Sequence, residues 1–101
     1  MKVIRTYARL LNGSGWDLDL IDGENLLNKI ISNDCYKSIS SLTNESKICL
    51  YNYSGKEIIN EVVSDDWPGL CAIDIEFEVD GDKWEISFMY NDKNEAYIFK
   101  H

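Results

Sequence analysis

Histidine and proline are almost absent from this chain, which has one of each, His101 and Pro68. Because chain ends commonly fray, we expect the last residue, His101, to be a poor general base. Neither a Ser–His–Asp nor a Cys–His catalytic arrangement can form without using this residue. The short stretch "NGSG" lacks the lysine of a phosphate-binding loop. The sequence therefore predicts a protein that is not an enzyme and uses no cofactor.

A recognisable metal-binding spacing is also missing. Asp80, Asp82 and Asp92 offer the oxygen ligands that calcium prefers, but their spacing does not match the twelve-residue loop of helix–loop–helix calcium sites. The three cysteines lie far apart in the sequence, and each adjoins apolar or aromatic residues. This setting is typical of reduced structural thiols. We therefore expect no bound metal.

No apolar run is long enough to span a bilayer, and no basic-then-apolar export signal begins the chain. These absences predict a cytoplasmic protein that does not contact a membrane. The 101 residues, 45% of them hydrophobic, suit a single domain covering residues 1–101 with a core of its own.

Positive charge is scarce in the second half of the chain. Residues 1–56 carry seven Lys/Arg and six Asp/Glu, whereas residues 57–95 carry twelve Asp/Glu and only two lysines. With Lys100, the net charge of the whole chain is −8. An acidic surface of this kind would repel nucleic acid and anionic membranes, and it favours a basic protein partner. The alternative is an acidic face that only keeps the protein soluble.

Residues 2–10 fit either a strand or a helix. The turn-forming "NGSG" and the alternating segment 16–21 after it favour a hairpin between the two segments. In that hairpin we expect Arg9 to face Asp17, because opposite charges across a ladder stabilise the register.

Two segments have the apolar spacing of helices. One is expected over 23–33 with Asp22 as its N-cap. The other is expected over 55–63, where Ser54 and Glu57 form a capping box, and a strand is the alternative there. The segments between them are predicted as a polar loop over 34–46 and a strand over 47–53.

The last third of the chain predicts a three-stranded meander with strands at 71–79, 83–90 and 95–100. "DG" between the first two strands is a strong signal for a two-residue hairpin turn. The resulting fold class is α+β: an antiparallel sheet with this C-terminal meander and the N-terminal hairpin, packed against one or two helices. If the last strand is a sheet edge, it could pair with a second copy, so the oligomeric state stays open.

The two-residue turn also sets a register that puts acidic residues together on one side of the sheet. Apolar residues then share one face, and Glu76 lies directly opposite Glu85 on the other. Like charges in this position cost up to about 1 kcal/mol, which a cationic partner would relieve. The other cross-strand pairs expected are Asp74 with Ser87, Glu78 with Lys83, Glu85 with Lys100, and Phe88 with Tyr97.

Two groups of residues are therefore candidates for binding a partner. The first is the acidic row of Asp74, Glu76, Glu78 and Glu85. The second lies in the loop "SDDWPG", where a tryptophan beside two acids could anchor an interface or simply hold the loop in place. This second group consists of Asp65, Asp66 and Trp67.

The segment "FEVDGDKWEISFMYND" (77–92) resembles the strand–"DG"–strand–"F-x-Y-x-D" pattern of small acidic immunity or antitoxin proteins. These proteins belong to bacterial polymorphic-toxin and contact-dependent growth inhibition systems and include the YezG-like group. The resemblance implies a cytosolic protein that neutralises a cognate toxin domain, often a basic nuclease, with the acidic row meeting toxin lysines and arginines. A phage-type nucleic-acid mimic that inhibits a host nuclease and a small ligand-binding domain are the alternatives.

Overall fold

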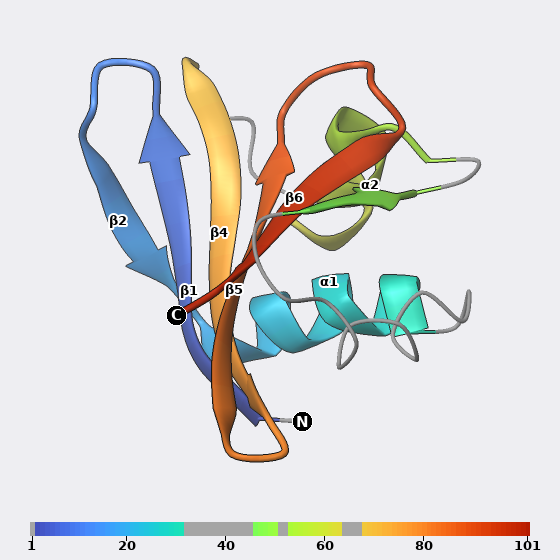
Figure 1. The fold of residues 1–101 in the computed structure, drawn as a ribbon. Helices are drawn as coiled ribbons and strands as arrows, with labels where there is room; N and C mark the ends of the chain where they lie inside the picture. Colours follow the sequence, from blue (N-terminus) through green and yellow to red (C-terminus); the bar gives the residue numbers. More distant parts are fainter. Residues whose placement is uncertain (1, 32–45, 51–52, 64–67) are drawn as a thin grey trace.

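The computed structural model describes residues 2–31, 46–50, 53–63 and 68–101, which form one antiparallel sheet with two helices packed on it. The strands are ordered β2-β1-β4-β5-β6-β3, and Figure 1 shows both helices on the same side of the sheet. The predicted α+β fold is confirmed. The elements are β1 (Lys2–Leu10), β2 (Gly15–Leu18), α1 (Leu20–Ile31), β3 (Ser46–Cys49), α2 (Gly55–Val62), β4 (Leu70–Val79), β5 (Asp82–Met89) and β6 (Glu95–Lys100).

The hydrophobic core lies between the sheet and the two helices. Apolar residues alternate along β4 and β5, so one face of each strand is buried. The helices cover that face with two apolar residues each, spaced to point to the same side. The central buried side chains are Ile73, Ile75, Phe77, Trp84, Ile86 and Phe88 from the sheet and Leu26, Leu27, Ile58 and Ile59 from the helices.

The hairpin between β4 and β5 has the predicted register. Asp80 and Gly81 both have positive φ, at 51° and 85°, which the two central residues of a type I′ turn require. Phe77 pairs with Trp84, and Glu76 lies opposite Glu85. The period of two along each strand then separates the apolar face from the acidic one.

Residues 2–10 form a strand, and the predicted N-terminal hairpin is present, but its register differs. Tyr7 lies opposite Asp17, and Arg9 lies opposite Gly15, so the expected pairing of Arg9 with Asp17 is wrong. The loop is tighter than expected because the Leu10 N–H donates to the Ser14 carbonyl at 2.8 Å. As a result, β2 begins at Gly15 and every pair shifts by two residues.

The register between β5 and β6 also differs from the prediction, here by one residue. Glu85 lies opposite Phe99 rather than Lys100, and Ser87 rather than Phe88 lies opposite Tyr97. Five residues connect the two strands, whereas the prediction assumed a loop of four. A one-residue shift turns each side chain to the other face. The expected lysine is therefore not beside Glu85.

Strand β6 is not at the edge of the sheet, contrary to the alternative that it pairs with a second copy. It lies between β5 and β3, with Lys47 opposite Tyr97 and Ile48 opposite Ala96. The sequence gives no direct signal for this pairing because β3 is far from β6 along the chain. The edges of the described sheet are β2 and β3.

The helices lie close to their predicted positions. Helix α1 starts at Leu20, so Asp22 lies in the first turn and is not the predicted N-cap. The ladder with β1 ends at Leu18, which leaves the following residues free to turn into the helix. The predicted N-cap of α2 is confirmed, because the Glu57 N–H donates to the Ser54 hydroxyl at 3.1 Å. The second half of the predicted capping box differs, since the Glu57 carboxylate accepts from the Ser54 hydroxyl at 3.2 Å.

Helix α1 approaches the sheet most closely at Gly23. A Cβ atom at this position would overlap the hydroxyl of Thr6 and contact Val3. Among the described residues, the Thr6 hydroxyl is the buried side-chain group without a hydrogen-bond partner. The contact between α1 and β1 therefore depends on glycine.

We expect Gly23→Ala to lower the free energy of unfolding by about 1 kcal/mol, because overpacking outweighs the higher helix propensity of alanine. Urea denaturation would measure the change. Combining it with Thr6→Ala should recover most of the loss, since the overlapping hydroxyl is then absent. A stabilised Gly23→Ala single variant would contradict the close contact.

Candidate functional site

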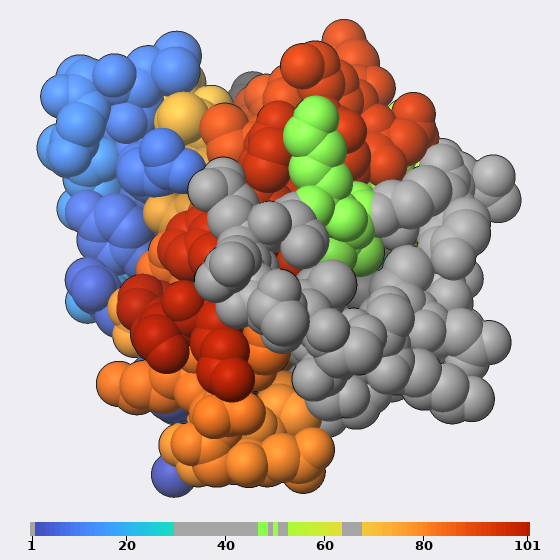
Figure 2. Space-filling view, in the orientation of Figure 1, coloured from blue at the N-terminus to red at the C-terminus, as the bar shows by residue number. Residues whose placement is uncertain are grey.

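The sheet surface opposite the helices is the part of the described structure that carries most of the acidic row, and we call it the open face. Two rows of residues cross it from strand to strand. Figure 2 shows atoms of β1, β5 and β6 at the surface on this side. The rows are Arg5–Glu76–Glu85–Phe99 and Tyr7–Asp74–Ser87–Tyr97.

Asp74 is engaged within the protein. The Arg9 guanidinium donates to its two oxygens, at 2.9 Å from Nε and 3.3 Å from Nη2. The Ser87 hydroxyl donates to the same carboxylate at 2.6 Å. The side chain of Asp74 is 15% exposed, and the hydrogen bond to it raises the pKa of Arg9. Asp74 therefore links β1, β4 and β5.

Glu76 and Glu85 face each other across the ladder. Within the described parts of the chain, neither carboxylate forms an ion pair. Arg5 lies opposite Glu76 but donates to Asp17 at 2.6 Å. Lys100, on the other side of the sheet, lies 3.3 Å from Asp82.

The pKa of Glu85 is raised, first by burial and then by the negative charge of Asp74, with a smaller contribution from Glu76. Its negative form is therefore less favourable in the folded protein than in the unfolded chain. A cation supplied by another molecule therefore has a favourable interaction with the ionised Glu85 that the free protein lacks.

We expect Glu85→Gln to raise the free energy of unfolding at pH 7 by a few tenths to about 1 kcal/mol, since it removes the opposed like charge. A raised folded-state pKa means that the wild type gains stability relative to this variant as pH falls and Glu85 becomes protonated. Urea denaturation at about pH 7 and about pH 4 would test both points. If the wild type is the more stable protein at pH 7, the repulsion is compensated.

A shallow hollow of about 400 Å³ lies beside Glu85 on the open face. Met89, Tyr97 and Phe99 give it apolar and aromatic surface, and the remaining lining residues are polar or charged. The alternation of "EAYIFKH" is the signal that could have placed Tyr97 and Phe99 on one face, but the expected register turned them away from Glu85. The polar lining residues are Arg9, Asp74, Glu85 and Ser87.

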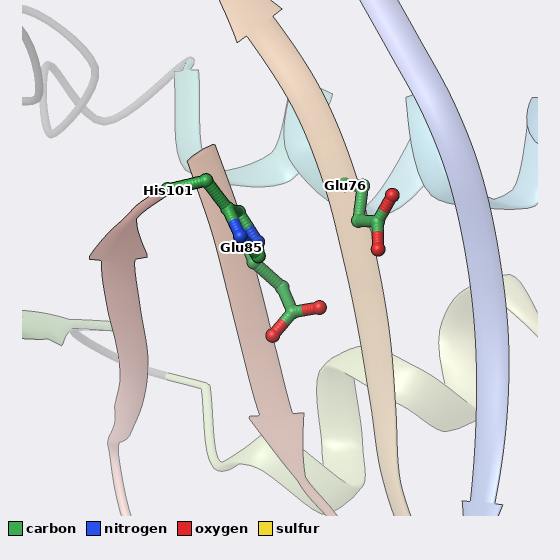
Figure 3. Close-up of side chains that lie close together, drawn as sticks. All are labelled: Glu76, Glu85 and His101. Atoms are coloured by element: carbon green, nitrogen blue, oxygen red, sulfur yellow. The ribbon is translucent and has the colours of Figure 1, made fainter. Parts of the chain in front are cut away.

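The backbone of His101 is hydrogen-bonded to β5, and its side chain is exposed. Its N–H donates to the Lys83 carbonyl at 2.9 Å, which continues the ladder beyond β6. Its ring lies 6.1 Å from that of Phe99 between centroids. One potential ligand atom from each of Glu76, Glu85 and His101 lies within 4.8 Å of the others. Figure 3 shows these three side chains.

The remaining candidates lie elsewhere. Glu78 is exposed near the end of β4, opposite Lys83. Asp80, Asp82 and Asp92 do not appear together among the described groups that could hold a metal. Asp65, Asp66 and Trp67 lie outside the described residues.

No protein-family model matches the sequence, and neither the curated proteins nor the solved structures give a match. In the described residues, no helix has the length and hydrophobicity needed to cross a membrane. Function is therefore inferred from the geometry and charge of the open face.

Proposed function

We propose that this protein is a non-enzymatic inhibitor that binds a basic protein through the open face. The observation that carries the proposal is the pair of opposed glutamates, Glu76 and Glu85, next to a hollow with aromatic surface. The expected residue on the partner is an arginine or lysine. Its charged group would balance the two carboxylates, and its aliphatic part would pack on Tyr97 and Phe99.

The arrangement of charge supports recognition of a cation. Arg9 donates its hydrogen bonds to Asp74, and both residues line the hollow beside Glu85. The net charge of −8 adds a long-range attraction that raises the rate of association with a basic partner. A charged anchor in a partly desolvated pocket is the usual form of an interface hot spot.

Within this class, we infer an immunity protein that neutralises a cognate toxin, a basic nuclease, in the cytoplasm. The support is the resemblance of residues 77–92 to the hairpin of such immunity proteins, together with the acidic open face. Carboxylates on this face would take the place of nucleic-acid phosphates on the toxin, or they would bind beside its active site.

The direct experiment is co-expression with the protein encoded immediately before this gene, since toxin and immunity genes are expected to be adjacent. The wild-type chain should protect cells, and Glu76→Gln with Glu85→Gln should protect less. The matched control combines Glu24→Gln with Asp92→Asn, two exposed residues outside the open face, and changes the net charge equally. Equal protection by the two double variants would reject the open face as the binding surface.

A further inference from the structure

Three side chains from separate strands meet at one end of the open face. Glu76 comes from β4, Glu85 from β5, and His101 follows β6. One carboxylate oxygen from each glutamate and one imidazole nitrogen lie within 4.8 Å of one another. In Figure 3 the His101 ring lies beside Glu85, and Glu76 stands on the neighbouring strand. Small rotations of these side chains would bring all three atoms to about 2.0–2.2 Å from a common centre.

A small recess adjoins these groups. It has a volume of about 160 Å³ and is lined by Glu76, Lys83, Trp84 and His101. This is below the range of roughly 300–1,000 Å³ that is usual for pockets holding organic ligands. It is ample for an ion with its remaining water ligands. The small volume therefore favours an ion over a metabolite.

The backbone places the three residues beside one another without a metal. Glu76 and Glu85 are fixed by the β4–β5 ladder, and His101 is fixed by its N–H bond to Lys83 at 2.9 Å. A divalent cation would neutralise the two opposed carboxylates together. Lys83 is the competing cation nearby, but among the described residues it forms no ion pair with either glutamate.

We propose that Glu76, Glu85 and His101 form a binding site for a divalent transition-metal ion, with zinc as the best match. The imidazole nitrogen favours zinc over magnesium or calcium, which prefer sets made only of oxygen ligands. Two carboxylates and one histidine leave at least one coordination position open to water or to a ligand from another molecule. The site does not depend on the proposed inhibitor function, because it uses only groups of this chain.

The test is a zinc titration of the untagged, chelator-treated full chain by calorimetry, without any partner protein. We expect one site per chain. His101→Ala and Glu85→Gln should each weaken binding at least about 10-fold. Lys83→Met should strengthen it by removing the competing charge, and Glu24→Gln should leave it unchanged. Circular dichroism of each variant would confirm that it is folded.

The single histidine gives a second, independent measurement. The imidazole nitrogen signals of ¹⁵N-labelled protein belong to His101 alone. Added zinc should shift these signals, and the shift should stop at the same ratio of zinc to protein as in the calorimetric titration. Cobalt should bind without a thiolate charge-transfer band. Unchanged imidazole signals, equal zinc affinity in His101→Ala, or a thiolate band would each overturn the proposal. Partner binding would be measured separately in the presence of a chelator. A failure to bind the partner is then distinguishable from a failure to bind zinc.

Discussion

Glu85→Lys is expected to weaken binding of the basic partner by at least about 100-fold, because it removes one carboxylate from the hollow and places a cation against the incoming arginine or lysine. Like charges at the centre of an interface cost several kcal/mol, and 1.4 kcal/mol corresponds to a factor of ten in affinity. Calorimetry with the purified partner would measure the change. The variant replaces the side chain whose pKa is raised by burial and neighbouring acids.

The same substitution should stabilise the free protein. A lysine at position 85 would lie opposite Glu76, so a repulsive pair becomes an attractive one. Loss of binding together with an unchanged or higher Tm would separate a surface effect from unfolding. Glu24→Lys, which makes the same charge change on an exposed position of α1, is the control and should affect binding little. Equal losses in both variants would mean that only net charge matters.

Arg9→Met is expected to lower the free energy of unfolding by about 1–2 kcal/mol, the largest stability effect predicted for a surface residue of this protein. Arg9 supplies two hydrogen bonds to Asp74, whose side chain is only 15% exposed. Without Arg9, the Asp74 carboxylate keeps only its hydrogen bond from Ser87 and lies close to the negative Glu85. An unbalanced, partly buried charge of this kind destabilises the folded protein. The expected loss in the free energy of unfolding is smaller than for a fully buried pair, because the Arg9 side chain is 41% exposed and solvent screens the pair.

Arg5→Met is the matched control for that prediction. Arg5 also bonds to an aspartate, at 2.6 Å from Asp17, but these side chains are 50% and 64% exposed. Solvent screens an exposed pair strongly, so this variant should lose less stability than Arg9→Met. Urea denaturation of both at the same pH gives the comparison. Equal losses would show that burial of Asp74 does not control the strength of the pair.

The register of the β4–β5 hairpin could be predicted from the sequence because its turn allows few alternatives. Asp80 and Gly81 suit a two-residue turn with positive φ, and each pair in the ladder follows from that turn. The opposition of Glu76 and Glu85 was therefore readable from the sequence. The N-cap of α2 was readable for a similar reason, because Ser54 and Glu57 interact over three residues.

The rest of the site could not be read in this way. The bond between Arg9 and Asp74 joins residues 65 positions apart, and no local pattern shows that β1 lies beside β4. The loop between β5 and β6 has no turn residues that fix its length, so a one-residue error moved Phe99 and Lys100 to the wrong faces. The same error hid the approach of His101 to the two glutamates.

We expect Glu76 and Glu85 to bind a cationic group of a partner, and the salt dependence of affinity probes this binding. The partner's Kd for the wild-type chain and for the Glu76→Gln, Glu85→Gln variant would be measured from about 0.05 M to about 0.5 M NaCl. If this binding occurs, the wild-type Kd should rise steeply with salt, and the Kd of the variant, higher throughout, should rise much less. Parallel curves, or a wild-type Kd that does not change with salt, would contradict it.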